Sequence, residues 1–136
     1  MTNNGIDKKS NKLEYKNYMN SLFDLYSCLL TEKQIEYFKY YYFLDYSLRE
    51  IASIYNVSSN AIYDQISNIE SSLERYEECL HLNELNSKRC DLIDKLEFDT
   101  SKINDLIENI DNEELRDAFN NLLKDLKDIK QLEEME

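Results

Sequence analysis

Catalytic and metal-binding side chains are sparse in this sequence. Glu78 and His81 have the Glu-x-x-His spacing that places two ligands on one helix face in di-metal bundles. Such a centre needs a second half-site, and His81 is the only histidine in the chain. The single glycine, Gly5, leaves no glycine-rich loop for a nucleotide phosphate. We therefore expect no catalytic residues, no metal and no cofactor, and a protein that is not an enzyme.

A second group of polar residues could read nucleic acid. It follows Val57 and comprises Ser58, Ser59, Asn60, Tyr63, Gln65 and Asn68. Asn and Gln make bidentate hydrogen bonds to adenine when a helix carries them into the major groove. The cations that could then contact phosphates are Lys33, Lys39 and Arg49. This chemistry requires a helix that begins near Ser58 and is held in place by its neighbours.

Capping signals predict two helices before that point. Thr31 is followed three residues on by Gln34, and Ser47 by Glu50. In this capping box the hydroxyl accepts from one backbone amide, and the carboxylate or amide side chain accepts from another. The stretch from Leu30 to Leu80 therefore contains two short helices and a longer one.

The turn before the longer helix is short. Ser58 is placed to cap this helix by accepting from an amide two or three residues on. Only Tyr55, Asn56 and Val57 remain for the turn, about the length found in helix-turn-helix motifs. Asn56 is the residue there that tolerates a left-handed backbone. Together these features predict a helix-turn-helix.

An apolar seam indicates that the last helix is long. Its residues recur at spacings of 4, 3, 4, 3 and 4: Ile62, Ile66, Ile69, Leu73, Tyr76 and Leu80. This is a heptad pattern, and it extends the helix to about 20 residues. Its lower part should pack either on the C-terminal helices of the same chain or on another molecule.

The run LLTEKQIEYFKYYYFLDYSLREIASIYNVSSNAIYDQI resembles the YlxM family of small bacterial helix-turn-helix proteins, which are similar to the last, promoter-reading domain of sigma factors. The likeness is close over about Leu29 to Tyr76. It implies an all-helical, non-enzymatic regulatory protein, linked by gene neighbourhood to the signal recognition particle. The comparison with sigma factors also implies that the group Ser58, Ser59, Asn60, Tyr63, Gln65 and Asn68 lies at the start of the recognition helix.

Charge argues against a nucleic-acid partner. The net charge is -12, from 28 acids and 16 bases, whereas affinity for DNA comes largely from Lys and Arg at phosphates. No Lys or Arg occurs between Ser59 and Glu74, where family members are expected to be basic, and Asp64 is acidic. A regulator that acts through contacts with protein partners, of basic charge, is therefore the preferred hypothesis, and the family resemblance implies the signal recognition particle components as candidates. The alternative is a sequence-specific DNA-binding transcription regulator.

Cysteine usage and hydropathy indicate the compartment. Cys28, Cys79 and Cys90 are odd in number and form no C-x-x-C pair, which favours a reducing environment. No window approaches about 18 consecutive apolar residues, and Met1 to Lys12 lacks the apolar core of a signal peptide. We expect a cytoplasmic protein without a membrane span.

Aromatic residues crowd the predicted helix from Glu32 to Phe43. They are Tyr37, Phe38, Tyr40, Tyr41, Tyr42 and Phe43. So many rings cover more than one helix face, and each ring buries a large area when it packs. Ile35, Phe38 and Tyr42 are expected in the core, with Tyr41 there or on the surface. Tyr37, Tyr40 and Tyr41 form a candidate surface for a protein partner or a homodimer, and stacking on unpaired bases is a third alternative.

The whole chain predicts an all-α fold: a sigma-factor-like helix-turn-helix bundle with a C-terminal helical hairpin extension. Residues 1–12 are polar and predict a disordered tail, and residues 13–80 form the helix-turn-helix domain. Residues 81–136 form the hairpin, which packs on the first domain or on a partner subunit. Within it we expect a break near residues 81–86, a helix ending near Phe98, and a short helix after the capping residues Asp99, Thr100 and Ser101. The last helix should begin at Asp111 or Asn112.

Overall fold

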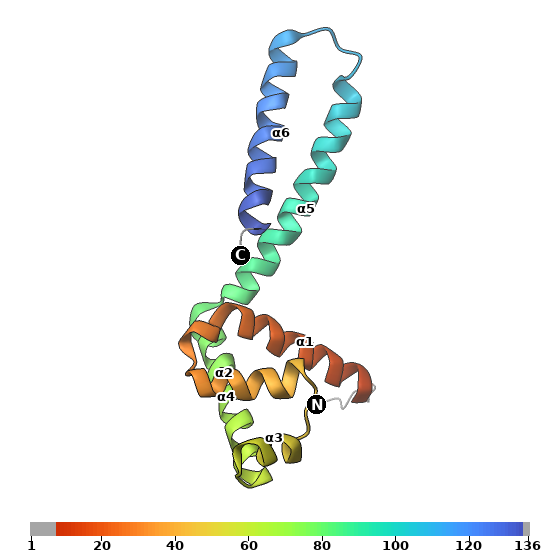
Figure 1. The fold of residues 1–136 in the computed structure, drawn as a ribbon. Coiled ribbons are helices and arrows are strands. Elements are labelled where there is room, and N and C mark those ends of the chain that lie inside the picture. Colours follow the sequence, from red (N-terminus) through yellow and green to blue (C-terminus); the bar gives the residue numbers. More distant parts are fainter. Residues whose placement is uncertain (1–7, 135–136) are drawn as a thin grey trace, which may run out of the picture. The chain divides into compact units, whose positions relative to one another are not determined.

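The computed structural model describes residues 8–134, which contain helices and no strand (Figure 1). The elements are α1 (Lys8–Tyr26), the short 3-10 helix η1 (Ser27–Leu29), α2 (Glu32–Phe38), the π-helix η2 (Lys39–Phe43), α3 (Leu48–Tyr55), α4 (Ser59–Leu80), α5 (Leu82–Ile107) and α6 (Glu113–Glu134). The predicted all-α class is confirmed. The chain divides into two compact units, Met1–Asn83 and Glu84–Glu136. Among the described helices, none has the length and hydropathy needed to cross a bilayer.

Both predicted capping boxes are present. The Thr31 hydroxyl accepts from the Gln34 amide at 3.2 Å, and the Thr31 amide donates to the Gln34 side chain at 2.9 Å. Likewise the Glu50 amide donates to the Ser47 hydroxyl at 3.2 Å, and the Ser47 amide donates to the Glu50 carboxylate at 2.7 Å. These bonds satisfy amides that no helix carbonyl can reach, and they start α2 and α3 at the predicted residues.

The turn between α3 and α4 also follows the sequence. Asn56 has φ 53° and ψ 48°, in the left-handed region, and ends α3. The Val57 amide donates to the Ala52 carbonyl at 3.0 Å. The Ser58 hydroxyl then accepts from the Ala61 amide at 3.1 Å and starts α4. The predicted helix-turn-helix is therefore confirmed, and α4 is 22 residues long.

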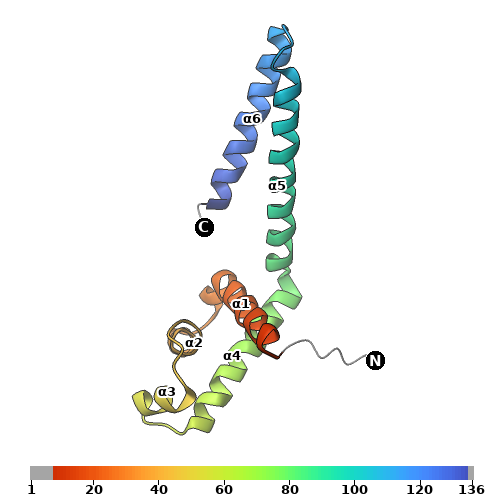
Figure 2. The same ribbon diagram turned by 90° about the vertical axis from the view of Figure 1, so that its right-hand side faces the viewer.

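The apolar seam of α4 forms the centre of the first unit's core. Ile62, Ile66, Ile69 and Leu73 are buried in one cluster with residues of α1, α2, η2 and α3. Figures 1 and 2 show these preceding helices beside α4 in both views. The prediction placed the lower part of the seam on the C-terminal helices or on another molecule. Leu73 and Tyr76 pack in or against the N-terminal core instead, whereas Leu80 is 50% exposed, so for this last residue the expectation stays a prediction. The N-terminal helices are close enough in sequence to fill the rest of the seam.

The N-terminal boundary differs from the expectation. The disordered tail was predicted for residues 1–12, and residues 1–7 of it lie outside the described residues. Helix α1 begins at Lys8, so residues 8–12 are helical. The polar composition of this stretch does not prevent it from continuing the helix that α1's apolar stripe stabilises further along.

In the second unit, one long helix replaces two predicted ones. Helix α5 continues through Thr100, whose hydroxyl donates to the carbonyls of Leu96 at 2.8 Å and Glu97 at 2.9 Å. A threonine that bonds back to the preceding turn remains inside a helix and does not cap a new one. The predicted break before α5 is likewise confined to His81, which has φ 55°.

The predicted C-terminal hairpin is formed by α5 and α6. Two ion pairs join its helices: Lys130 to Glu97 at 2.7 Å and Arg89 to Glu133 at 2.5 Å. Helix α6 starts at Glu113, after Asn112, whose side chain accepts from the Leu115 amide at 3.1 Å. The start predicted at Asp111 or Asn112 therefore corresponds to a real cap.

Candidate functional site

The recognition face lies on the first turns of α4, and we define it as Asn60, Tyr63, Gln65 and Asn68, which are all exposed. Ser59 is half-buried, and the Ser58 hydroxyl is already occupied by the cap. The apolar seam on the other side of α4 fixes this face outward, because helix positions three and four apart share a side. Five of the six predicted recognition residues thus retain side chains that could contact a partner.

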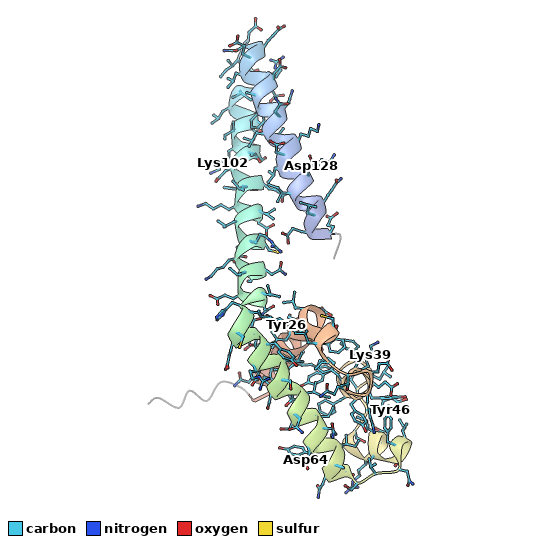
Figure 3. The ribbon with its side chains drawn as sticks, turned by 90° about the vertical axis from the view of Figure 1, so that its left-hand side faces the viewer. Tyr26, Lys39, Tyr46, Asp64, Lys102 and Asp128 are labelled. Atoms are coloured by element: carbon cyan, nitrogen blue, oxygen red, sulfur yellow. The ribbon has the colours of Figure 1, made fainter. Side chains whose placement is uncertain are left out.

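The acidic residues of α4 do not gather on this face. The Tyr42 hydroxyl donates to the Glu70 carboxylate, and the Tyr15 hydroxyl donates to Glu74 at 3.3 Å. Glu70 and Glu74 therefore point toward η2 and α1. Asp64 is the acid that remains exposed next to the recognition face, and Figure 3 shows it on α4. The face is consequently polar, with a single negative charge beside it and no cation.

The three predicted phosphate contacts come from three elements. Lys33 lies in the first turn of α2, Lys39 starts η2, and Arg49 lies in the first turn of α3; all three are exposed. The Lys33 ammonium lies 5.7 Å from the ring centre of Tyr37 and 6.0 Å from that of Tyr55. Because Tyr55 is the last residue of α3, Lys33 lies beside the helix-turn-helix turn. Lys33 is thus the cation with a defined position near the motif.

The tyrosine surface predicted on α2 and η2 requires a correction. Tyr37 is buried in the core and meets Tyr55 edge to face, with ring centres 4.8 Å apart. Tyr40 and Tyr41 are half-buried and pack against the same core. A π-helix bond from the Leu44 amide to the Lys39 carbonyl widens the turn here. Because this winding differs from that of an α-helix, a helical wheel could not assign Tyr40 and Tyr41 correctly.

Sequence reasoning did not find a buried carboxylate in the first unit. Glu77 is only 8% exposed, and its carboxylate accepts from the Tyr26 hydroxyl at 2.7 Å and from the Asn83 amide at 3.0 Å. The Leu82 amide donates to the Tyr26 oxygen at 3.2 Å. This network joins α1, the end of α4 and the start of α5. In the sequence, Glu77 is marked only as an acidic residue next to the apolar seam of α4, and this pattern is too common to identify a buried carboxylate.

Several tyrosines in the first unit have perturbed titration. Burial, followed by neighbouring carboxylates, raises the pKa of Tyr15, Tyr42 and Tyr55 well above the usual value, and burial also raises the pKa of Tyr26. Each folded-state pKa therefore exceeds the unfolded value of about 10. The stabilisation from the neutral phenols is complete below about pH 10 and is lost as the pH rises further.

We therefore expect alkaline unfolding of the first unit. Above about pH 10, phenolate absorbance should appear in the same transition as the loss of helical circular dichroism. Tyr42→Phe should reduce the dependence of the unfolding free energy on pH. Ionisation of all tyrosines near pH 10 with helicity retained would contradict this expectation.

Comparisons with known proteins agree with this geometry. The model of the family described as "Putative helix-turn-helix protein, YlxM / p13 like" matches residues 13–113. UPF0122 protein lin1916 of Listeria innocua is 48% identical over 97 residues, which are 71% of this chain and 88% of the relative. A UPF0122 protein of Lactococcus lactis subsp. cremoris is 52% identical over 71 residues, which are 52% of this chain and 64% of the relative. The matched range contains the capping boxes, the turn and α4, and it ends where α6 begins. The chain therefore belongs to the YlxM / p13-like family of helix-turn-helix proteins.

Proposed function

We propose that this protein is a cytoplasmic regulator whose helix-turn-helix binds a protein partner. The observation that carries the proposal is the composition of the exposed side of α4. It presents Asn60, Tyr63, Gln65 and Asn68 beside Asp64, and the sequence has no Lys or Arg from Ser59 to Glu74. A helix that enters a DNA groove normally gains much of its affinity from cations at the phosphates. This face offers none.

The same face suits a protein surface. Tyr63 is exposed at its edge, and tyrosine is enriched among the residues that dominate the binding energy of protein interfaces. The net charge of -12 favours a basic partner and speeds its approach. The resemblance to the YlxM family makes signal recognition particle components the first partners to test. A homodimer, which would present two recognition faces, is part of this proposal.

DNA binding is the second candidate, and a specific feature favours it. Asn60, Gln65 and Asn68 place exposed amides on one helix after the turn, and amides can read adenine. With Lys33, Lys39 and Arg49 as phosphate contacts, the slope of log affinity against log salt would be only about -3. Such binding would be weak at physiological salt.

Two titrations with the full chain separate these functions. We expect no retained complex with random duplex DNA at about 50 mM salt by fluorescence anisotropy. We expect the purified signal recognition particle to bind, and Tyr63→Ala to weaken this binding by about tenfold or more. Tyr46→Ala, at an exposed ring outside α4, is the matched control and should have little effect. A DNA complex that Asn60→Ala and Gln65→Ala abolish, with no protein binding, would establish the second candidate instead.

A further inference from the structure

Helices α5 and α6 each carry two seams at heptad spacing. The inner seam joins the two helices of the hairpin. On α5 it is Ile93, Glu97, Thr100, Asn104 and Ile107, and on α6 it is Phe119, Leu123, Leu126, Lys130 and Glu133. Ile93, Thr100, Phe119 and Leu126 are buried, and Glu97 pairs with Lys130. The inner seam is therefore the contact line between α5 and α6.

The second, outer seam is exposed. On α5 it is Leu92, Leu96, Asp99, Ile103 and Leu106, and on α6 it is Leu115, Ala118, Leu122, Asp125, Ile129 and Leu132. Outer-seam residues directly precede inner-seam positions, which rotates them by about 100° on each helix. Because the helices of a hairpin are antiparallel, the same rotation brings both outer seams to one side. The hairpin thus has a single broad apolar face.

Exposure along this face follows that geometry. The members nearer the middle of the face, Leu96, Ile103, Leu115, Leu122 and Ile129, are 40–49% exposed. The members nearer its margins are more exposed, with Leu92 at 61% and Leu106 at 75%. Soluble monomers rarely expose a contiguous apolar patch of more than a few hundred Å².

The exposed outer seam is more apolar than the buried inner one. Between Ile93 and Ile107 the inner seam of α5 has only polar residues, whereas Asp99 is the only polar residue in the outer seam of α5. When α5 packs only on α6, the outer seam, which is the more apolar of the two, therefore remains exposed to water. The largest gain in apolar burial comes from covering the outer face.

Charges at the margins of this face indicate what covers it. On α5 the margin carries Lys95 and Lys102, two turns apart at heptad spacing. On α6 the corresponding positions carry Glu114 and Asp128. All four side chains are exposed, and Figure 3 labels Lys102 on α5 and Asp128 on α6. The face is thus bordered by cations on one helix and by anions on the other.

We propose that a second copy of the chain covers this face, so that two hairpins form a four-helix bundle with α5 next to α6 of the partner subunit. A two-fold axis along the bundle gives this arrangement and preserves the level of each residue along the axis. The Lys130–Glu97 pair fixes that level, and Asp128 is half a turn from Lys130. Asp128 of the partner subunit then lies level with Asp99 of α5, between Lys95 and Lys102 along the helix. A two-fold axis across the bundle would instead place α5 beside α5 and bring like charges together.

This inference locates the homodimer of the proposed function, and it does not depend on what the recognition face binds. Helix α6 begins at the last residue matched by the family model, so the α6 half of this interface lies outside the match and the α5 half inside it. Asp99 and Asp125 interrupt the two outer seams. A single polar residue in such a seam lowers stability while it specifies register.

The first test is the mass of the full chain in solution, by light scattering and sedimentation equilibrium. We expect the wild-type chain to be a dimer. The variant that combines Leu92→Glu with Leu106→Glu should be a monomer whose helical circular dichroism is unchanged. Both side chains are largely exposed in the single chain, so the hairpin itself should still fold. The dissociation constant should rise by about a hundredfold or more, because each change occurs on both subunits. The matched control is Ile54→Glu, which is 50% exposed on α3 in the first unit and should leave the dimer intact.

The second test determines which helices are neighbours. Lys95→Glu with Lys102→Glu should weaken the dimer about tenfold or more, and mixing it with Asp128→Lys should restore association. Asp99→Leu should tighten the dimer. Tightening by the lysine changes would show α5 beside α5 and overturn the arrangement. Binding of the signal recognition particle, measured on the same variants, reports separately on the proposed function.

A monomeric wild-type chain would overturn the proposal. If Leu92→Glu with Leu106→Glu then lowered the unfolding temperature of the first unit, the face would be covered by that unit of the same chain. Equal loss of the dimer in the Ile54→Glu control would also overturn it, because the effect would not be specific to the outer seam.

Discussion

Phe38→Ala is expected to lower the free energy of unfolding of the first unit by about 3–5 kcal/mol. Phe38 is fully buried, and its ring stacks on Phe23 at 4.2 Å and on Tyr42 at 4.3 Å between ring centres. These neighbours belong to α1 and η2, so the ring joins two elements around the α4 seam. Truncation removes the buried surface and leaves a cavity that rigid neighbours fill poorly. Urea denaturation followed by circular dichroism measures the effect.

The neighbouring Phe43→Ala is the matched control for this prediction. Phe43 is 45% exposed, although its ring also contacts Phe23 and Phe38 edge to face. Its removal exposes less new surface and should cost clearly less than the removal of Phe38. Equal losses for the two variants would show that the core is not centred on Phe38.

Tyr26→Phe should destabilise the first unit by about 1.5–3 kcal/mol. The change removes the hydroxyl that donates to buried Glu77 at 2.7 Å, and it also removes the acceptor of the Leu82 amide. The apolar ring remains, so the loss isolates the polar network between α1, α4 and the start of α5. A hydrogen bond to a carboxylate is worth most where water cannot replace the donor.

Tyr55→Phe provides the comparison with the same chemistry in water. The Tyr55 hydroxyl donates to the Glu36 carboxylate at 2.6 Å, but this pair is exposed. Its loss should cost no more than about 1 kcal/mol, because water replaces the lost donor. The two variants are compared by urea denaturation at neutral pH. A larger loss for Tyr55 than for Tyr26 would contradict the assignment of Glu77 as a buried carboxylate.

The helix-turn-helix could be predicted because its signals are local. The Thr31 and Ser47 capping boxes and the Ser58 cap each join atoms three residues apart, so neighbouring side chains settle them. The left-handed Asn56 likewise depends on one residue's own steric freedom. The recognition face then follows from the phase of the α4 seam.

The long-range contacts were not predictable in this way. The partners Tyr26 and Glu77 lie 51 residues apart, and Tyr15 and Glu74 lie 59 apart. The expectation for Tyr37 was wrong because its ring packs against Tyr55 of α3, a contact between separate helices that no local signal marks. Thr100 was predicted to cap a helix because a threonine hydroxyl can accept from an amide later in the chain or donate to a carbonyl of the preceding turn. Which hydrogen bond forms depends on whether the helix continues through the residue.

By itself, the sequence determined where most helices of the first unit start, where the turn lies and which side of α4 is apolar, because those features depend on short-range sterics and hydrogen bonds. Only the tertiary structure decided which charged side chains of α4 lie near the recognition face. Tyrosine hydroxyls from α1 and η2 turn Glu70 and Glu74 away from it, and packing between distant segments brings those partners together. The charge that a partner meets at α4 is therefore a property of the fold, whereas the chain's total charge of -12 is a property of its composition.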